Sequence, residues 1–365
     1  MTSLNAPLTF VHGPEIKNRF MLSPLTNLQS NDDGTLGEDE LNFLVKRAEG
    51  GFGLVMTCAA SVHMSGKAFK GQLGCYADDH IPGLKRIATA LRAVGALSSV
   101  QLHHAGGRAD AALNGGQLYG PWDDEQRGIK AMTTAQVEDT IQHFINAAIR
   151  CEKAGFDGVE LHGAHGYLLC QFLDERHNNR TDRFGGSYEN RTRIYHEVIE
   201  GVRAATGPDF QLGIRLSAER YGYSIAIARQ FAQELMTGGK LDYIDMSLWD
   251  SFKLPEEEAY KSKMLIDWFT DLDRSHCRLG VAGKLLSAKD VQACLDHGAD
   301  FVLIGRGAIL HHDFPQQILA NPDFVSQSFP VTPAYLAHEA VGTAFIQYLA
   351  TAWENYVVKP PVPRD

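Results

Sequence analysis

The chain has 365 residues, of which 44% are hydrophobic, so it can bury a core large enough for one big α/β domain. Acidic residues outnumber basic residues by 44 to 34, and the basic residues are scattered, which argues against the positive stripe that nucleic acids and anionic lipids require. No apolar run is long enough to span a bilayer. We therefore expect neither nucleic acid nor a membrane as a partner.

The N-terminus, MTSLNAPLTF, lacks a basic start followed by an apolar stretch, so we expect the protein to stay in the cytoplasm. The cysteines are far apart, without the C-x-x-C spacing that zinc sites and iron–sulfur clusters use. We expect reduced thiols in the core, none of them catalytic. The six cysteines are Cys58, Cys75, Cys151, Cys170, Cys277 and Cys294.

Residues 1–19 predict a short lead-in, and eight short apolar or β-branched runs follow it along the chain. Such near-continuous apolar runs are typical of parallel strands that are covered on both faces. The predicted strands are Phe20–Leu25, Phe52–Thr57, Leu97–Leu102, Asp157–His162, Gln211–Leu216, Leu241–Met246, Arg278–Ala282 and Phe301–Ile304.

Amphipathic stretches that often end at glycine separate these runs, which predicts helices between the strands. They include Glu38–Gly50, Ile81–Val94, Thr134–Ala154, Glu189–Ala205 and Ala288–His297. The alternation predicts a single (β/α)8 TIM barrel over residues 1–365, with an open doubly wound sheet as the alternative. An open Rossmann sheet would want G-x-G-x-x-G after its first strand, where this chain has SPLTN. The barrel is therefore favoured, with its active site where the strands end.

Two segments fall outside this alternation. Residues 103–131 carry glycine and proline and are too long for an ordinary connection, so we expect a functional loop or lid there. Residues 332–365 predict a C-terminal extension and tail, with helix over Tyr335–Val357 before PPVPRD.

The fourth strand runs into VELHGAHGYLLCQF, which brings His162, His165 and Tyr167 to the end of a barrel strand. Two imidazoles in that place can bind a metal or can hydrogen-bond one oxygen atom of a ligand. A metal needs a third ligand and usually a carboxylate behind each histidine, and the sequence offers no obvious set. We therefore expect no metal.

The block HGAHGYLLCQFLDERHNNRTDRFGGSYENR resembles the Old Yellow Enzyme family of FMN-dependent ene-reductases, and a thinner resemblance extends from about Asn18 to Phe314. The resemblance implies that His162 and His165 hold the carbonyl oxygen of the substrate. It also implies that Tyr167 donates a proton to the α-carbon.

The same resemblance assigns residues to the flavin ring. Thr26 matches the position that hydrogen-bonds the flavin C4 carbonyl, where some relatives have cysteine. Gln101 resembles the glutamine that reads the pyrimidine edge, and Arg215 resembles the cation beside N1 and the C2 carbonyl. Pro24 and Ala59 would approach the ring through their backbones.

The FMN phosphate is expected after the seventh and eighth strands, as is usual in these barrels. There Gly283 and Gly305 allow close backbone approach, and Arg306 offers a guanidinium. Relatives often have two adjacent glycines in the first segment, where this chain has Ala282 and Gly283. The segment Arg180–Arg191 is expected to be structural, with Ser187 as a helix cap and Asp182 paired with nearby arginines.

As a whole, the resemblance implies an FMN oxidoreductase that takes hydride from NADPH or NADH and reduces an activated alkene by a ping-pong cycle. The family often forms dimers or tetramers, so a homo-oligomer is one expected state. A non-catalytic flavin-binding redox sensor or partner-binding barrel is the alternative. Dihydrouridine synthesis is disfavoured because it needs a catalytic cysteine and a basic surface. The roles of His103 and His104 stay open.

Overall fold

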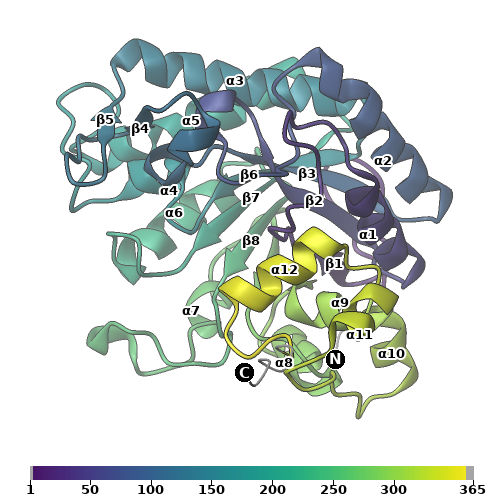
Figure 1. The fold of residues 1–365 in the computed structure, drawn as a ribbon. Coiled ribbons are helices and arrows are strands. Elements are labelled where there is room, and N and C mark those ends of the chain that lie inside the picture. Colours follow the sequence, from purple (N-terminus) through teal and green to yellow (C-terminus); the bar gives the residue numbers. More distant parts are fainter. Residues whose placement is uncertain (1–2, 359–365) are drawn as a thin grey trace, which may run out of the picture.

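Eight parallel strands close into a barrel in the computed structural model, which describes residues 3–358 (Figure 1). Around the barrel the strand order is β1-β10-β9-β8-β7-β6-β3-β2, so each neighbour is the next barrel strand along the chain. The predicted TIM barrel is confirmed. Its strands are β1 (Phe20–Leu22), β2 (Leu54–Ser61), β3 (Leu97–His103), β6 (Gly158–Gly163), β7 (Gln211–Ser217), β8 (Tyr243–Ser247), β9 (Arg278–Ala282) and β10 (Phe301–Ile304).

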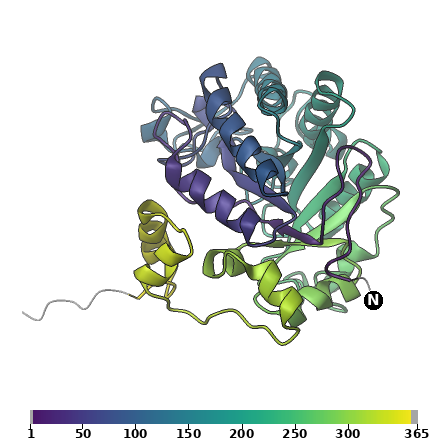
Figure 2. The same cartoon turned by 90° about the vertical axis from the view of Figure 1, so that its right-hand side faces the viewer.

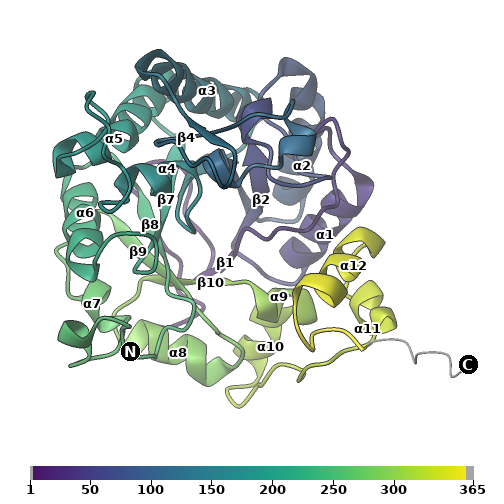
Figure 3. The same cartoon turned by 60° about the vertical axis from the view of Figure 1, so that its left-hand side comes forward.

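Helices surround the strand ring on its outer side (Figure 3). The longer ones are α1 (Glu38–Glu49), α2 (Ile81–Ala93), α3 (Thr134–Lys153), α5 (Tyr188–Ala205), α6 (Ile225–Thr237) and α8 (Ala288–Asp296). Hydroxyl side chains cap four of them by accepting a hydrogen bond from a first-turn backbone N–H. These caps are Thr133, Ser187, Ser224 and Ser287.

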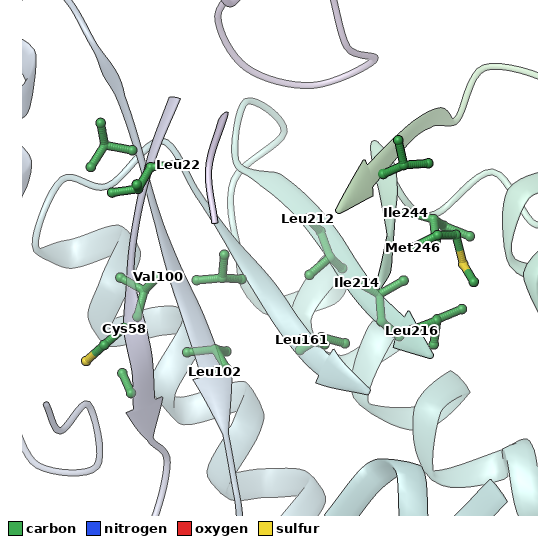
Figure 4. Close-up of a cluster of buried hydrophobic side chains, with 14 of the residues drawn as sticks. Leu22, Cys58, Val100, Leu102, Leu161, Leu212, Ile214, Leu216, Ile244 and Met246 are labelled. Carbon is green, nitrogen blue, oxygen red and sulfur yellow. The ribbon is translucent and has the colours of Figure 1, made fainter. Parts of the chain in front are cut away.

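Side chains alternate along each strand between the helices and the barrel interior. Figure 4 shows buried hydrophobic side chains of the outer layer. Its labelled members include Val100, Leu102, Leu161, Leu212, Ile214, Leu216, Ile244 and Met246. The residues between them face inward, and near the ends of the strands these inward positions are polar.

The lead-in lies against the other end of the barrel. Leu8 and Ile16 form an antiparallel bridge, and both are buried against interior residues such as Met56 and Phe301. This end is filled by apolar side chains, and the cavity of the barrel lies at the end where the strands finish.

Residues 103–131 contain two 3₁₀ turns (Gly106–Arg108 and Ala111–Leu113) and the paired strands β4 (Leu118–Gly120) and β5 (Ile129–Ala131). Their position beside α4 (Leu168–Leu173) is visible in Figure 1. The segment is thus an insertion between β3 and α3 that has its own secondary structure.

The C-terminal extension differs from the single helix predicted over Tyr335–Val357. It forms α11 (Pro333–His338) and α12 (Thr343–Ala352), which stand at the side of the barrel in Figure 2. The helix breaks because Ala340 adopts a left-handed backbone with φ of 55°. Phe345 of α12 packs edge-to-face on Phe43 of α1. Residues 359–365 of the predicted tail lie outside the described residues.

Within residues 3–358, no helix is long and apolar enough to cross a membrane, and no group of three His, Cys, Asp or Glu side chains is placed to hold a metal ion. All six cysteines are free and buried. The burial agrees with the core thiols expected from the sequence.

Asp242 is expected to be one of the most sensitive positions for stability. It is fully buried, and its carboxylate accepts hydrogen bonds from the backbone N–H groups of His12 at 2.9 Å and Leu212 at 2.8 Å, and pairs with Arg203 at 2.6 Å. Replacing it with alanine leaves these donors unpaired, so the free energy of unfolding should fall by about 3 kcal/mol. Urea unfolding measures this. The exposed Asp323→Ala should change stability by less than about 0.5 kcal/mol, and equal effects would contradict the assignment.

Candidate active site

A cavity of about 740 Å³ opens at the carboxyl ends of the strands. Its wall includes every residue that the sequence assigned to catalysis or to FMN binding. These are Pro24, Thr26, Ala59, Gln101, His162, His165, Tyr167, Arg215, Gly283, Gly305 and Arg306. Residues from 24 to 306 along the chain are thus gathered at one mouth by barrel closure.

The two histidines face each other across the end of β6. Nε2 of His162 lies 3.3 Å from Nδ1 of His165, and Nε2 of His165 lies 2.8 Å from the hydroxyl oxygen of Ser247. His162 is fixed by its Nδ1, which accepts the backbone N–H of Ala164 at 3.3 Å, so the neutral ring carries its proton on Nε2. His165 has a left-handed backbone with φ of 60°, held where its own N–H donates to Ser217 at 2.9 Å.

Ser247 allows His165 two proton arrangements, because a hydroxyl both donates and accepts. When Ser247 donates to Nε2, the His165 proton sits on Nδ1. The guanidinium of Arg215 also donates to the Ser247 oxygen at 3.5 Å, which is compatible with both arrangements because a hydroxyl oxygen can accept two hydrogen bonds. With the His165 proton on Nδ1, the two ring N–H groups can both donate to one acceptor atom placed beside the pair.

Tyr167 stands next to this pair. Its ring makes edge-to-face contacts with His162 at 5.1 Å and with His103 at 4.4 Å between centroids. The Arg108 guanidinium lies 4.6 Å from the Tyr167 ring centroid and donates to the backbone oxygen of His165. Arg108 therefore joins the 103–131 segment to the residues after β6.

Burial sets the protonation of these groups. It lowers the pKa of His162 and His165 well below the ordinary value, and the charges of Arg215 and Arg108 lower both further. Burial also raises the pKa of Tyr167, with Arg108 opposing the shift. Around neutral pH the site therefore presents two neutral imidazoles and a neutral phenol, which are donors without net charge.

Gln101 and Arg215 reach the cavity from β3 and β7, and each has a buried carboxyl behind it. Nε2 of Gln101 donates to Glu160 at 2.7 Å, and Nε of Arg215 lies 2.9 Å from Asp245. These contacts fix both side chains before any ligand arrives.

The wall after β9 and β10 is built from Gly283, Gly305 and Arg306. A side chain at Gly283 would collide with the backbone nitrogen and hydroxyl of Ser251, so packing alone requires glycine there. The Arg306 guanidinium lies 5.1 Å from the ring centroid of Trp353, beyond α12. The ammonium of Lys284 is already paired with Asp250 at 2.9 Å.

The sequence left the roles of His103 and His104 open, and the structure places the two residues in different surroundings. His103 lines the cavity, and its Nδ1 lies 3.2 Å from the Gln72 amide nitrogen, so its proton is on Nε2, a buried atom with no partner in residues 3–358. His104 is buried outside the cavity wall, where it contacts Ser65 at 3.1 Å. Only His103 is in a position to meet a ligand.

The Arg180–Arg191 segment is structural, as its sequence indicates. Asp182 binds Arg180 and accepts from Thr134 at 2.7 Å, and Ser187 caps α5. None of these residues lines the cavity.

Several wall residues escaped the sequence analysis. Tyr221 and Trp249 follow β7 and β8, and an aromatic residue just past a strand end was the signal that could have found them. Tyr348, Trp353 and Tyr356 come from the C-terminal extension and carry no local signal. Their place depends on how α12 folds back beside α9 (Arg306–Leu310), which Figures 1 and 3 both show.

The residues present fit FMN. The cavity volume is in the range of cofactor sites, and the wall mixes apolar groups with a few directed polar ones. The Nε2–H of His103 has no partner in residues 3–358 and can donate to a ligand acceptor. Gln101 and Arg215 are already held by Glu160 and Asp245, so they can bind a polar ring edge without reordering. Arg306 supplies the cation that a phosphate requires.

Comparisons with known proteins agree with this reading. The model of the NADH:flavin oxidoreductase / NADH oxidase family matches residues 3–323. The probable NADH-dependent flavin oxidoreductase YqiG of Bacillus subtilis is 36% identical over 310 residues, covering 82% of this chain and 83% of the relative. An NADPH dehydrogenase of Bacillus velezensis is 39% identical over 241 residues, covering 64% and 69%.

Among solved structures, morphinone reductase has a TM-score of 0.77 and 26% identity, and the match covers 91% of this chain and 92% of that one. The fold, the cavity and the family match point the same way. The chain belongs to the NADH:flavin oxidoreductase / NADH oxidase family, known as the Old Yellow Enzyme family, and is an FMN-dependent NAD(P)H oxidoreductase.

Proposed function

We propose that this oxidoreductase reduces the activated C=C bond of α,β-unsaturated carbonyl compounds. The observation that carries the proposal is the convergence of two facing imidazoles, His162 and His165, with the phenol of Tyr167 at the cavity wall. The family assignment supports catalysis over the non-catalytic sensor or partner-binding barrel.

His162 and His165 would hold the carbonyl oxygen of the substrate. Two N–H donors on one oxygen draw electron density away from the conjugated β-carbon and stabilise the negative charge that develops on that oxygen. His162 is buried, His165 is half-buried, and hydrogen bonds hold both residues beforehand, so the two imidazoles need little reorganisation as this charge appears.

Tyr167 would protonate the α-carbon. A phenol is a weak acid, but in a pocket that excludes water it suffices for a carbon that has gained negative charge. Its raised pKa keeps the proton on the oxygen until that stage.

Bound FMN would accept a hydride from NAD(P)H and pass it to the β-carbon. For this role we assign Thr26, Gln101 and Arg215 to the polar edges of the ring, and the backbones of Pro24 and Ala59 to its faces or margins. Gly283, Gly305 and Arg306 are assigned to the phosphate.

One cavity contains both groups of residues, which supports a ping-pong order in which nicotinamide leaves before the alkene enters. We also propose that residues 103–131 act as a lid in a single-domain enzyme, since Arg108 of that segment contacts His165 and Tyr167. A cytoplasmic location and a homo-oligomeric state stay predictions.

The test is an anaerobic two-step titration of the purified enzyme. NADPH or NADH should bleach the flavin, and cyclohexenone added next should restore its visible absorbance while the C=C bond becomes saturated. Bleaching that no activated alkene reverses, across enones, nitroalkenes and quinones, would overturn the proposal and favour a sensor.

Arg306 offers a separate test of the cofactor assignment. Charge-assisted hydrogen bonds to phosphate contribute about 1.5–3 kcal/mol, so Arg306→Leu should weaken FMN binding about ten- to a hundredfold. Riboflavin has the same ring without the phosphate, so its affinity should hardly change. Fluorescence titration of the deflavinated protein measures both. Equal losses for the two ligands would show that Arg306 does not bind the phosphate.

A further inference from the structure

Two buried carboxyl groups lie directly behind the polar residues assigned to the flavin. Glu160 on β6 is in register with Gln101 on β3, and Asp245 on β8 is in register with Arg215 on β7. Both carboxyl side chains are completely buried and neither lines the cavity. They can affect a bound ring only through Gln101 and Arg215.

A single cation serves this pair. The guanidinium of Arg215 lies 2.9 Å from Asp245, and its charge also acts on Glu160. The titratable or charged groups that face Glu160 are Arg215 on β7 and Asp245 and Tyr243 on β8. With Arg215 alone to balance them, two ionised carboxylates would leave an uncompensated charge in the barrel interior.

Hydrogen bonding relieves only part of that cost. One oxygen of Glu160 accepts from Gln101 at 2.7 Å, but the other, together with both oxygens of Asp245, has no well-aligned hydrogen-bond donor in residues 3–358. Burial raises the pKa of both acids. The charge of Asp245 raises that of Glu160 further, with Arg215 and the Gln101 hydrogen bond opposing, while for Asp245 Arg215 opposes burial with no like charge raising the pKa. The geometry and these directions agree that Glu160 keeps its proton.

We propose that Glu160 and Asp245 share one negative charge, and that the resulting neutral group with Arg215 sets the reduction potential of the bound FMN. This inference rests on the proposed placement of Arg215 beside the flavin. Both acids are positioning residues, because they act through Gln101 and Arg215.

The shared charge implies that either acid can replace the other. In Asp245→Asn the repulsion on Glu160 disappears, so Glu160 ionises and the group stays neutral. In Glu160→Gln a neutral amide replaces a carboxyl group that was already neutral, so the charge of the group does not change. Only the double variant leaves Arg215 with an unbalanced positive charge, which favours the reduced flavin and its negative charge near N1.

The experiment measures the midpoint potential of bound FMN against reference dyes in the wild type, both single variants and the double variant. Each single change should shift the reduction equilibrium constant by less than about threefold. The double change should raise it about tenfold, equal to about 30 mV for a two-electron couple. Asp157→Asn, which alters an acid at the other end of β6, is the matched control and should shift nothing.

Infrared spectroscopy gives a second readout that does not depend on flavin. Difference spectra against the wild type should show that the carbonyl stretch of one buried protonated carboxyl is lost from both Glu160→Gln and Asp245→Asn, since in the latter Glu160 has ionised. The fully buried Glu40, whose pKa burial raises to about 7, contributes equally to all three proteins and cancels in these spectra. The amide substitutions preserve shape, and circular dichroism checks folding.

Absence of that lost band from either difference spectrum, additive shifts in the single variants, or an unchanged potential in the double variant would each overturn the proposal. Reoxidation of the wild type by cyclohexenone is scored separately, so failure of the ene-reductase proposal remains distinguishable.

Discussion

Replacing both His162 and His165 with alanine is expected to slow reoxidation of the reduced enzyme by cyclohexenone at least about a thousandfold. Losing one preorganised donor to a developing oxyanion typically costs about a hundred- to a thousandfold in rate. Here both donors to one oxygen would be gone. Anaerobic stopped-flow measurement of flavin absorbance gives the rate constant directly.

The same variant should also lose the binding of simple phenols, whose oxygen takes the place of the carbonyl oxygen. His165→Asn is the informative partner, because an amide keeps one N–H donor and should retain part of the rate. The exposed His338→Ala is the control for removing an imidazole, and it should behave as the wild type. Unchanged phenol affinity and rate in the double alanine variant would show that the two rings do not hold the substrate.

Tyr167→Phe is expected to lower the rate of alkene reduction about a hundred- to ten-thousandfold, the usual contribution of a positioned general acid. Reduction of the flavin by NAD(P)H needs no proton from this phenol, so that half-reaction should hardly change. Stopped-flow kinetics of the two half-reactions separates the effects. Equal losses in both would point to a disturbed cavity rather than to a missing acid.

The pH profile of the alkene half-reaction tests the role of Tyr167 by the direction in which the rate changes with pH. Burial raises the pKa of Tyr167, so the donor form persists on the alkaline side up to at least the ordinary phenol value of about 10. The rate should fall only above that value, and this fall should be absent from Tyr167→Phe. On the acid side the imidazoles stay neutral well below about pH 6.5, because burial lowers their pKa.

Local chemistry made much of the barrel predictable. Buried parallel strands such as Phe301–Ile304 are continuous apolar runs, and hydroxyl caps such as Ser187 mark where helices begin. Strand β8 begins two residues later than predicted, at Tyr243, because Leu241 and Asp242 belong to the turn that precedes it. The break at Ala340 was missed because alanine gives no sign of a left-handed backbone.

The residues after strands were predictable as part of the site for the same reason, since closure of a barrel brings all the strand ends together. Trp353 and Tyr348 could not be predicted as part of the site, because their contact with the cavity depends on the path of a C-terminal segment. The charge balance of Glu160 and Asp245 could not be predicted from the sequence either. The partners of inward-facing acids depend on the register between neighbouring strands, which places Glu160 beside Gln101 and Asp245 beside Arg215.

The most direct measurement is a crystal structure of the FMN-bound enzyme with a simple phenol. We expect the phenol to stack over the isoalloxazine, with its oxygen within hydrogen-bond distance of a ring nitrogen of both His162 and His165 and with Tyr167 above the same face. A flavin bound elsewhere, or these three side chains turned away from it, would contradict the proposed function.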